Sequence, residues 1–266
     1  MDINSAKLIY FSPTKTTRKV IEGISQGLQV VNVEHVDLTL SDAMIQERPV
    51  FYDDLAVIGA PVYSGRLPTV AISRLRKLTG NGAPAVIVVV YGNRAYEDAL
   101  LELMDVALDA GFKPIAAGAF IGEHSYSTNY TPIAVGRPDL EDLGRAKAFG
   151  KMIREKMINM RALDQLVPLQ VPGNFPYKEP RMLSDISPAI QEVLCKRCKQ
   201  CTSVCPTAAI NMDDPTLTEK SLCIRCCACV KSCQVGAKTM DDPRIKQGAE
   251  QLSVNCAIRK EAETYL

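Results

Sequence analysis

The ten cysteines of this chain gather near its C-terminal end, in a pattern that suits iron. None occurs before Cys195, and eight of them form two C-x2-C-x2-C-x3-C runs that are offset by 28 residues: Cys195, Cys198, Cys201 and Cys205, then Cys223, Cys226, Cys229 and Cys233. Two-residue spacers let three thiolates of one loop reach three corners of a cube, and soft thiolates bind sulfide-bridged iron well. Zinc ribbons use pairs of CxxC instead. The spacing therefore predicts two [4Fe-4S] clusters.

This doubled run resembles the bacterial two-cluster ferredoxins. In that family the fourth thiolate of each run ligates the other cluster. The resemblance thus assigns Cys195, Cys198, Cys201 and Cys233 to cluster one, and Cys223, Cys226, Cys229 and Cys205 to cluster two. One departure is Gln234, where the family pattern has proline. Cys227 and Cys256 are left over, and we expect them to pack as small side chains rather than to bind metal.

Three loops in the first half carry residues suited to a flat, phosphorylated ligand. Ser12-Pro13-Thr14-Lys15-Thr16-Thr17 opens a helix, where unpaired backbone N–H groups and the helix dipole favour an anion. An ordinary hydroxyl N-cap is the alternative. The other two loops pair a tyrosine that can stack with a glycine that allows close approach. Each tyrosine taken singly fits a half-buried surface position as well. Neither GxxxxGK nor GxGxxG occurs at a strand end, which argues against a Walker loop and a nicotinamide domain.

Strands that alternate with helices are predicted to position these loops. Apolar runs predict strands at 6–11, 30–38, 55–59, 84–91 and 115–121, and periodic apolar faces predict helices at 17–28, at 100–108 and from about Asp139. Such alternation implies an α/β fold with a doubly wound parallel sheet covered on both faces. Ligands of these sheets bind beyond the carboxyl ends of the strands. The three loops are expected to meet there.

Residues 6–158 resemble a flavodoxin, a resemblance carried by those three loops in order. It implies a five-stranded sheet of order 2-1-3-4-5 and an FMN cofactor. The phosphate would be held by the first loop, which comprises Ser12, Pro13, Thr14, Lys15, Thr16 and Thr17. The flavin ring would be held by Pro61, Val62, Tyr63, Gly65, Tyr91, Gly92, Asn93 and Tyr96. Flavodoxins usually have glycine where this chain has Lys15, which costs energy if that residue needs a positive φ.

The whole chain resembles the bacterial and archaeal family in which a flavodoxin domain is fused to a small α+β two-cluster ferredoxin domain. We divide it into a flavodoxin-like domain (1–160), a proline-rich linker or strap (161–188), a ferredoxin domain (189–242) and a C-terminal extension (243–266). The resemblance implies transfer of single electrons between the clusters and FMN, which links one-electron and two-electron redox partners. Two alternatives stay open: an FMN-dependent reductase of a small organic acceptor, and a ferredoxin carrier whose flavodoxin-like domain is empty and serves for docking.

The charge and composition of the chain limit the partners and the cellular location that we expect. A formal net charge of +1 gives no reason to expect nucleic acid or an anionic membrane as a partner. No run of roughly 20 apolar residues occurs, and the first residues do not resemble a signal peptide. We expect a cytoplasmic, anaerobic protein with redox proteins as partners, either as a single chain or as a homodimer.

His124 is expected to be a hydrogen-bonded loop residue. The charges around the cysteines, such as Lys231, are expected to be solvated or to dock an acidic partner.

Overall fold

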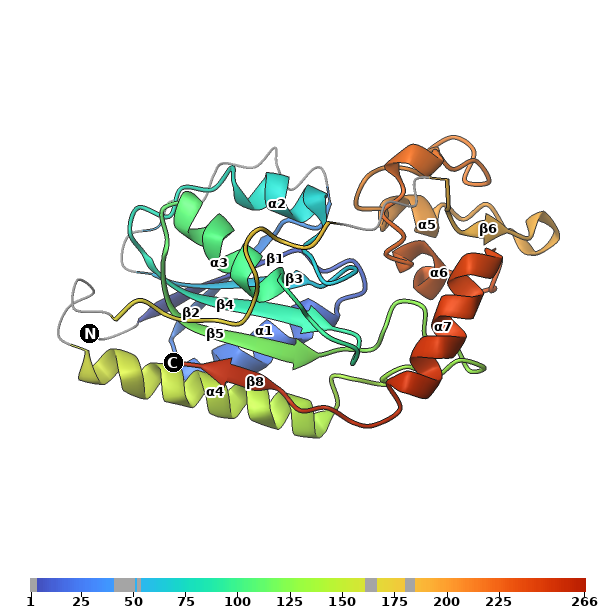
Figure 1. Ribbon diagram of the computed structural model, residues 1–266. Helices are drawn as coiled ribbons and strands as arrows, with labels where there is room; N and C mark the ends of the chain where they lie inside the picture. Colours follow the sequence, from blue (N-terminus) through green and yellow to red (C-terminus); the bar gives the residue numbers. More distant parts are fainter. Residues whose placement is uncertain (1–3, 41–50, 52–53, 161–166, 180–184) are drawn as a thin grey trace.

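A six-stranded sheet forms the centre of the first half of the chain (Figure 1). The computed structural model describes residues 4–40, 51, 54–160, 167–179 and 185–266. The strand order is β2-β1-β3-β4-β5-β8, and the first five strands are parallel. Their bounds are β1 (Ser5–Tyr10), β2 (Asn32–Asp37), β3 (Leu55–Pro61), β4 (Pro84–Tyr91), β5 (Lys113–Ile121) and β8 (Glu263–Tyr265). The predicted α/β fold and the order 2-1-3-4-5 are confirmed, and this order is that of flavodoxin-like folds.

The predicted number of strands was wrong by one. The chain returns at its C-terminal end to add β8, which pairs antiparallel with β5 through Ala117 and Tyr265. The sheet therefore has six strands, and its last edge is covered by the C-terminal segment, which runs beside α4 in Figure 1. This strand has only three residues and no apolar run, so its sequence lacks the signal that identifies the buried strands.

Helices cover both faces of the sheet, as expected for parallel strands. On one face lie α1 (Thr16–Leu28) and α4 (Leu140–Asn159), and on the other lie α2 (Thr69–Leu75) and α3 (Ala99–Asp109). Helix α4 begins with a capping box in which Asp139 and Asp142 accept from each other's backbone N–H groups. This cap follows from the predicted Asp-x-x-Asp start. Strand β4 is buried along its whole length and joins the two apolar layers.

The described part of the proline-rich segment, residues 167–179, lies against α3 rather than apart from the sheet domain. Two backbone N–H groups of this segment, those of Asn174 and Lys178, donate to the Asp98 carboxylate at 2.9 and 2.7 Å. Leu169 and Val171 pack against the adjoining core. The segment is thus an extended strap held by one buried carboxylate just before α3.

The cysteine-rich half repeats its backbone as well as its sequence. It contains β6 (Ala189–Ile190), η3 (Glu192–Leu194), α5 (Gln200–Ser203), η4 (Lys220–Leu222), α6 (Ala228–Ser232) and β7 (Lys238–Thr239). Ile190 pairs with Lys238, and 28 residues away from each, Thr218 pairs with Ile210. The offset also relates left-handed residues to one another, namely Arg197 to Arg225, Lys199 to Cys227 and Ala208 to Gly236. Two equivalent loops therefore face each other across a pseudo-twofold arrangement.

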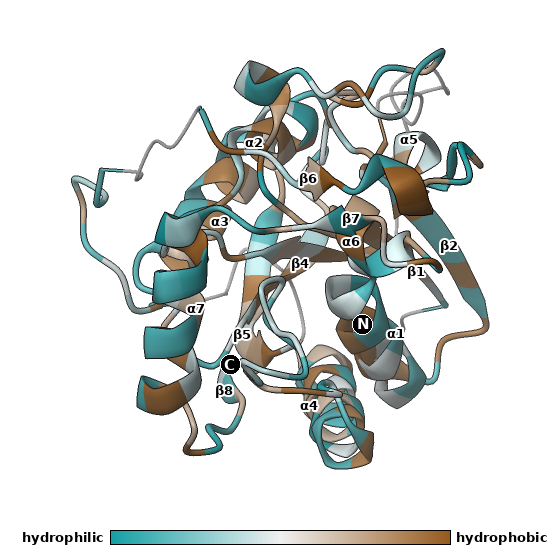
Figure 2. Cartoon of the chain, turned by 90° about the vertical axis from the view of Figure 1, so that its right-hand side faces the viewer, coloured by the Kyte–Doolittle hydropathy of each residue, from teal (hydrophilic) through white to brown (hydrophobic). Residues whose placement is uncertain are grey.

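Helix α7 (Pro243–Asn255) connects this half to the returning strand β8 (Figure 1). The Asp242 side chain caps its first turn by accepting from the Arg244 N–H at 2.9 Å. Figure 2 looks onto this end of the molecule, with α7 to one side of the sheet ends and α4 below. Among the described helices, none has the length and apolarity needed to cross a membrane.

Candidate functional site

A cleft of about 590 Å³ opens at the carboxyl ends of the parallel strands. Its wall on the sheet side comes from the loop after β1 and from the segments after β3, β4 and β5, so the structure brings the three predicted loops together. Of the residues expected to bind a flavin, those that line the cleft are Thr14, Thr16, Pro61, Val62, Tyr63, Tyr91 and Gly92. A cleft of this size, part apolar and part polar, is typical of a cofactor site.

The first loop forms a tight turn at the start of α1. The Ser12 hydroxyl accepts a hydrogen bond from the Arg18 backbone N–H at 3.1 Å, so it caps the helix locally. Lys15 sits at the N-cap position with φ 65°, in the left-handed region. A non-glycine residue there carries a steric cost of roughly 1–2 kcal/mol, which is the cost that the departure from glycine implied. Pro13 and Lys15 shape the turn and are not part of the cleft lining.

One hydroxyl group of this loop has no hydrogen-bond partner in the part of the chain that the structure describes. The Thr17 Oγ1 is buried and has no hydrogen-bond partner among the described residues. Such an orphan costs about 1–3 kcal/mol unless a ligand satisfies it. Thr14 and Thr16 face the cleft nearby, with their hydroxyl oxygens 3.5 Å apart. Hydroxyl groups at the N-terminus of a 13-residue helix fit an anionic group such as a phosphate.

The loop after β3 is a tight hairpin that places Tyr63 in the cleft. Tyr63 and Arg66 exchange backbone hydrogen bonds at 2.9 and 3.1 Å, and Ser64 and Gly65 between them both have positive φ. A two-residue turn of this kind favours glycine. A Cβ on Gly65 would also lie 2.1 Å from the Glu97 carboxylate, so only glycine fits. Gly65 therefore shapes the loop behind the cleft instead of lining it.

Two residues expected at the flavin ring instead hold the C-terminal segment. The Asn93 amide donates to the Cys256 and Ile258 carbonyls at 2.7 and 2.8 Å and accepts from the Lys260 N–H at 3.1 Å. The Tyr96 hydroxyl lies 2.8 Å from the Glu263 carboxylate and 2.9 Å from the Tyr265 hydroxyl. Neither side chain is among those that line the cleft.

His124 packs against Gly92, the residue that follows β4. A Cβ on Gly92 would lie 2.3 Å from the imidazole ring, so that glycine makes room for the histidine. The His124 Nδ1 accepts a hydrogen bond from the Tyr126 N–H at 3.1 Å, which places the proton of the neutral ring on Nε2. Burial, helped by the cations Arg94 and Lys231, lowers the pKa of His124 to about 4. The ring is therefore neutral at physiological pH and carries its N–H on Nε2 in the cleft wall.

The opposite wall of the cleft comes from the cysteine-rich half and from α7, including Ile224, Arg225, Arg244, Ile245 and Leu252. Direct contacts fix the two walls relative to each other. Lys231 donates to the Glu123 carboxylate at 2.6 Å and to the Ser127 carbonyl at 2.8 Å. The buried Arg74 guanidinium of α2 donates to the Pro206 carbonyl at 2.7 Å. The Lys231 ammonium group therefore connects the two walls and is not simply solvated.

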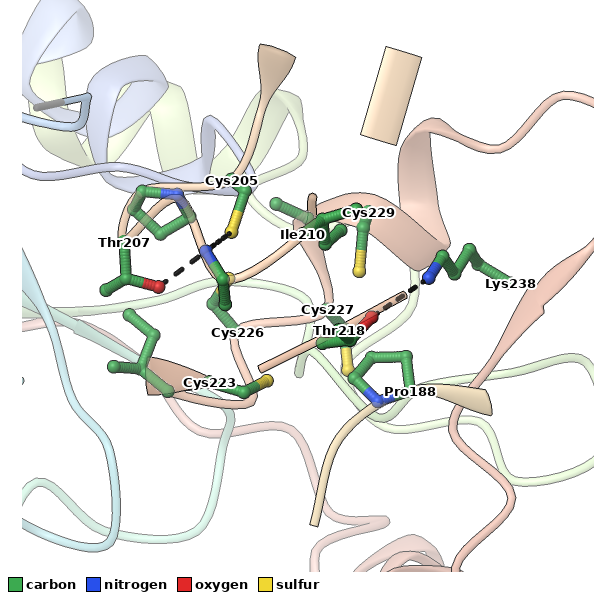
Figure 3. A pocket seen from close by; sticks show the side chains of 14 residues that line it. Pro188, Cys205, Thr207, Ile210, Thr218, Cys223, Cys226, Cys227, Cys229 and Lys238 are labelled. Carbon is green, nitrogen blue, oxygen red and sulfur yellow. Dashed lines mark hydrogen bonds between the residues drawn. The ribbon is translucent and has the colours of Figure 1, made fainter. Parts of the chain in front are cut away.

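The cysteines assigned to cluster two line one small apolar cavity (Figure 3). Cys205, from the first run, lies there with Cys223, Cys226 and Cys229 from the second. The crossing of a fourth thiol from the other run is the arrangement that the ferredoxin pattern implies. Burial raises the pKa of Cys226 and of Cys229 to about 12, so their thiolates need a bound cation to be stable. These four residues fit a metal cluster.

Fewer of the described contacts connect the cysteines assigned to cluster one than connect those assigned to cluster two. Cys195 and Cys198 are electrostatic neighbours of Cys201, while Cys233 ends α6. Cys198 is exposed, whereas Cys226 and Cys229 are buried, so the two runs differ in their access to solvent. None of the ten cysteines, all of which lie in the described ranges, forms a disulfide. Within the described ranges, no three His, Cys, Asp or Glu side chains converge on one point as a single ion requires. Ligands of a four-iron cube instead bind separate corners.

The cleft and the cluster-two cavity adjoin, because Ile224 lines both of them. Tyr63 lines the cleft, and the thiols of Cys226 and Cys227 act on its hydroxyl group electrostatically. Burial, with those two thiols as further causes, raises the pKa of Tyr63 well above its usual value. Tyr126, a second cleft residue, has Cys227 and Cys223 as neighbours. Cys227 is buried against this contact, as its spacing led us to expect.

Sequence reasoning missed several residues at this site. Helix α7 supplies much of the second wall, and Arg74 anchors the Pro206 carbonyl beside Cys205. Lys238 enters the cluster-two cavity. The position of Lys238 within the 28-residue repeat was the only signal that could have singled it out, because the equivalent residue is Ile210.

No protein-family model matches this chain, and a comparison with curated proteins gives no match. Solved structures that resemble it include a flavodoxin from the domain Archaea (14% identity, 58% of this chain and 99% of that one, TM-score 0.38). A Fusobacterium nucleatum flavodoxin bound to flavin mononucleotide covers 57% of this chain and 98% of its own (14% identity, TM-score 0.37). Rubredoxin oxygen:oxidoreductase from Desulfovibrio gigas has 12% identity and a TM-score of 0.41, with 58% of this chain matching 36% of that one. At these identities and scores the likeness does not assign a function.

Proposed function

We propose that this protein is an electron carrier that passes single electrons between two [4Fe-4S] clusters and an FMN. The observation that carries the proposal is that the cleft and the cluster-two cavity adjoin, since Ile224 lines both of them. A flavin and a cluster bound at these sites would be neighbours across this shared wall. FMN accepts one or two electrons, so it would connect one-electron to two-electron redox partners.

The chain itself supplies binding, orientation and exclusion of water. The first loop offers the Thr14 and Thr16 hydroxyl groups to a phosphate, whereas the unmet Thr17 hydroxyl is buried and does not line the cleft. Tyr63 and Tyr91 offer aromatic surface to the flavin ring, and the neutral His124 offers an N–H donor. Helix α7 and the cysteine-rich half cover the cleft, which limits the access of water to the bound group.

The contacts between the two halves hold this arrangement in one orientation. The Lys231–Glu123 ion pair and the Arg74 hydrogen bond to Pro206 bridge the halves at two separate places. A fixed orientation suits transfer inside one chain, with external redox proteins as the donors and acceptors. The exposed Cys198 suggests that electrons enter or leave at cluster one.

Cofactor stoichiometry of the anaerobically purified chain tests this proposal. We expect about one FMN by release and fluorescence, and about eight iron atoms with matching acid-labile sulfide, since two four-iron clusters are assigned. Eight irons without FMN, even after FMN is added, would contradict the proposed flavin site and leave a ferredoxin carrier with a docking domain. Absence of iron would contradict the proposal altogether.

A further inference from the structure

Lys238 carries a charge into the interior of the cysteine-rich half. The residue is 3% exposed, and its side chain lines the cavity formed by the cluster-two cysteines (Figure 3). Its ammonium group contacts the Thr218 hydroxyl at 3.2 Å. The residues that line this cavity include no carboxylate. A lysine is almost never buried without an opposite charge, because an unpaired ammonium is costly to desolvate.

The place of Lys238 in the internal repeat is informative. Its counterpart 28 residues earlier is Ile210, so only the second repeat brings a cation inward. Lys238 lines the cavity of the cluster-two cysteines, and its charge acts on Cys223 and Cys229 of that site. Its charge also acts on Cys201, which is assigned to cluster one. Lys238 is therefore buried at cluster two and also acts on an assigned ligand of cluster one.

We infer that Lys238 is the internal counter-charge of the two clusters and makes both of them easier to reduce. The inference rests on the proposed function, because it requires that the clusters be bound. Each reduction takes one electron from an external one-electron donor and adds one negative charge to a buried site. A cation in the same low-dielectric interior stabilises that added charge. Net charge is among the properties that set the potentials of iron–sulfur clusters.

This position also offers a reason why the two clusters can hold two electrons at once. Two reduced clusters repel each other across the pseudo-twofold arrangement, and an ammonium that acts on assigned ligands of both offsets part of that repulsion. Two electrons held together match the number that FMN accepts in full reduction. Lys238 would thereby be a positioning and tuning residue for electron transfer, without binding iron itself.

A potentiometric titration of the iron-loaded protein with dithionite, followed by electron paramagnetic resonance of the reduced clusters, tests the inference. Lys238→Met removes the charge and keeps a side chain of similar length, and Lys238→Arg keeps the charge. We expect the Met variant to lower the equilibrium constant for cluster reduction about tenfold, which is about 59 mV for a one-electron couple. The Arg variant should stay close to the wild type. Lys220→Met, which removes an exposed lysine of the same half, should leave the potentials unchanged.

Two outcomes would overturn the inference while leaving the proposed function intact. One is a set of unchanged potentials in Lys238→Met with both clusters present. The other is loss of the clusters in both Lys238→Met and Lys238→Gln, which would show that Lys238 is needed to build the site and does not tune it. A wild-type chain that binds no iron would instead refute the proposed function.

Discussion

Replacing Cys226 with serine is expected to reduce the iron content from about eight to about four atoms per chain, because one cluster would lose a buried ligand. Cys226 lines the cavity with the other cluster-two thiols and neighbours Tyr63 at the flavin cleft. The same substitution should therefore abolish the reduction of FMN by electrons that enter through the iron sites. Iron and sulfide analysis, together with flavin absorbance under a one-electron donor, measures both effects.

Two matched serine variants separate this effect from general damage. Cys256→Ser removes a cysteine that is assigned to neither cluster, so eight irons are expected. Because Cys256 lines the cleft, this variant is the control for iron content alone. Cys198→Ser should also remove about four irons, but it should leave the cluster beside the cleft in place. An unchanged iron content in the Cys226→Ser protein would refute the ligand assignment.

Replacing Gly150 with alanine should lower the free energy of unfolding by up to about 2 kcal/mol, although alanine favours helices. A Cβ at this position would lie 2.1 Å from the Ile24 carbonyl oxygen and 2.9 Å from the Gly27 Cα. Helices α1 and α4 cross here, and backbone atoms cannot move aside as a side chain can. The propensity gain of about 1 kcal/mol is smaller than the cost of forcing the helices apart, typically about 1–3 kcal/mol and occasionally more. The midpoint of urea unfolding, followed by circular dichroism, measures the change.

Gly144 provides the control within the same helix. It is exposed, and a Cβ there would meet no atom within 4 Å. Gly144→Ala should therefore raise the free energy of unfolding by up to about 1 kcal/mol, since only the helix propensity changes. Equal effects of the two substitutions would show that the α1–α4 crossing is not as close as described.

The buried strands of the sheet were predictable because each is a continuous apolar run in the sequence. Strand β4 begins and ends at the predicted residues, and the alternation of apolar runs with helical faces predicted that the strands are parallel. The strand order was predicted from the resemblance to flavodoxins. Strand β8 and helix α2 were missed. Each is short, and each is stabilised by what it contacts: β8 by pairing with β5, and α2 by Leu75 in the adjoining core. Local sequence carries little information about such elements.

The site was predictable where a motif sets geometry through the chain itself. Cysteine spacing placed four thiols around one cavity, and the order of the loops brought Thr16, Tyr63 and Tyr91 to one cleft. The roles of Asn93 and Lys238 depend on contacts with residues far along the chain, the C-terminal segment for one and the facing repeat for the other. Spacing along the sequence gives no access to those contacts.

Rapid mixing of the FMN- and iron-loaded protein with a pre-reduced ferredoxin, under anaerobic conditions, tests the central claim most directly. Transfer within one chain predicts that the iron–sulfur absorbance bleaches first and the flavin absorbance follows, with a second rate constant that does not change when the protein is diluted. In the Cys226→Ser protein, the second phase should disappear. Flavin reduction at the wild-type rate in that variant, or a second phase that slows on dilution, would contradict electron transfer between clusters and flavin inside this chain.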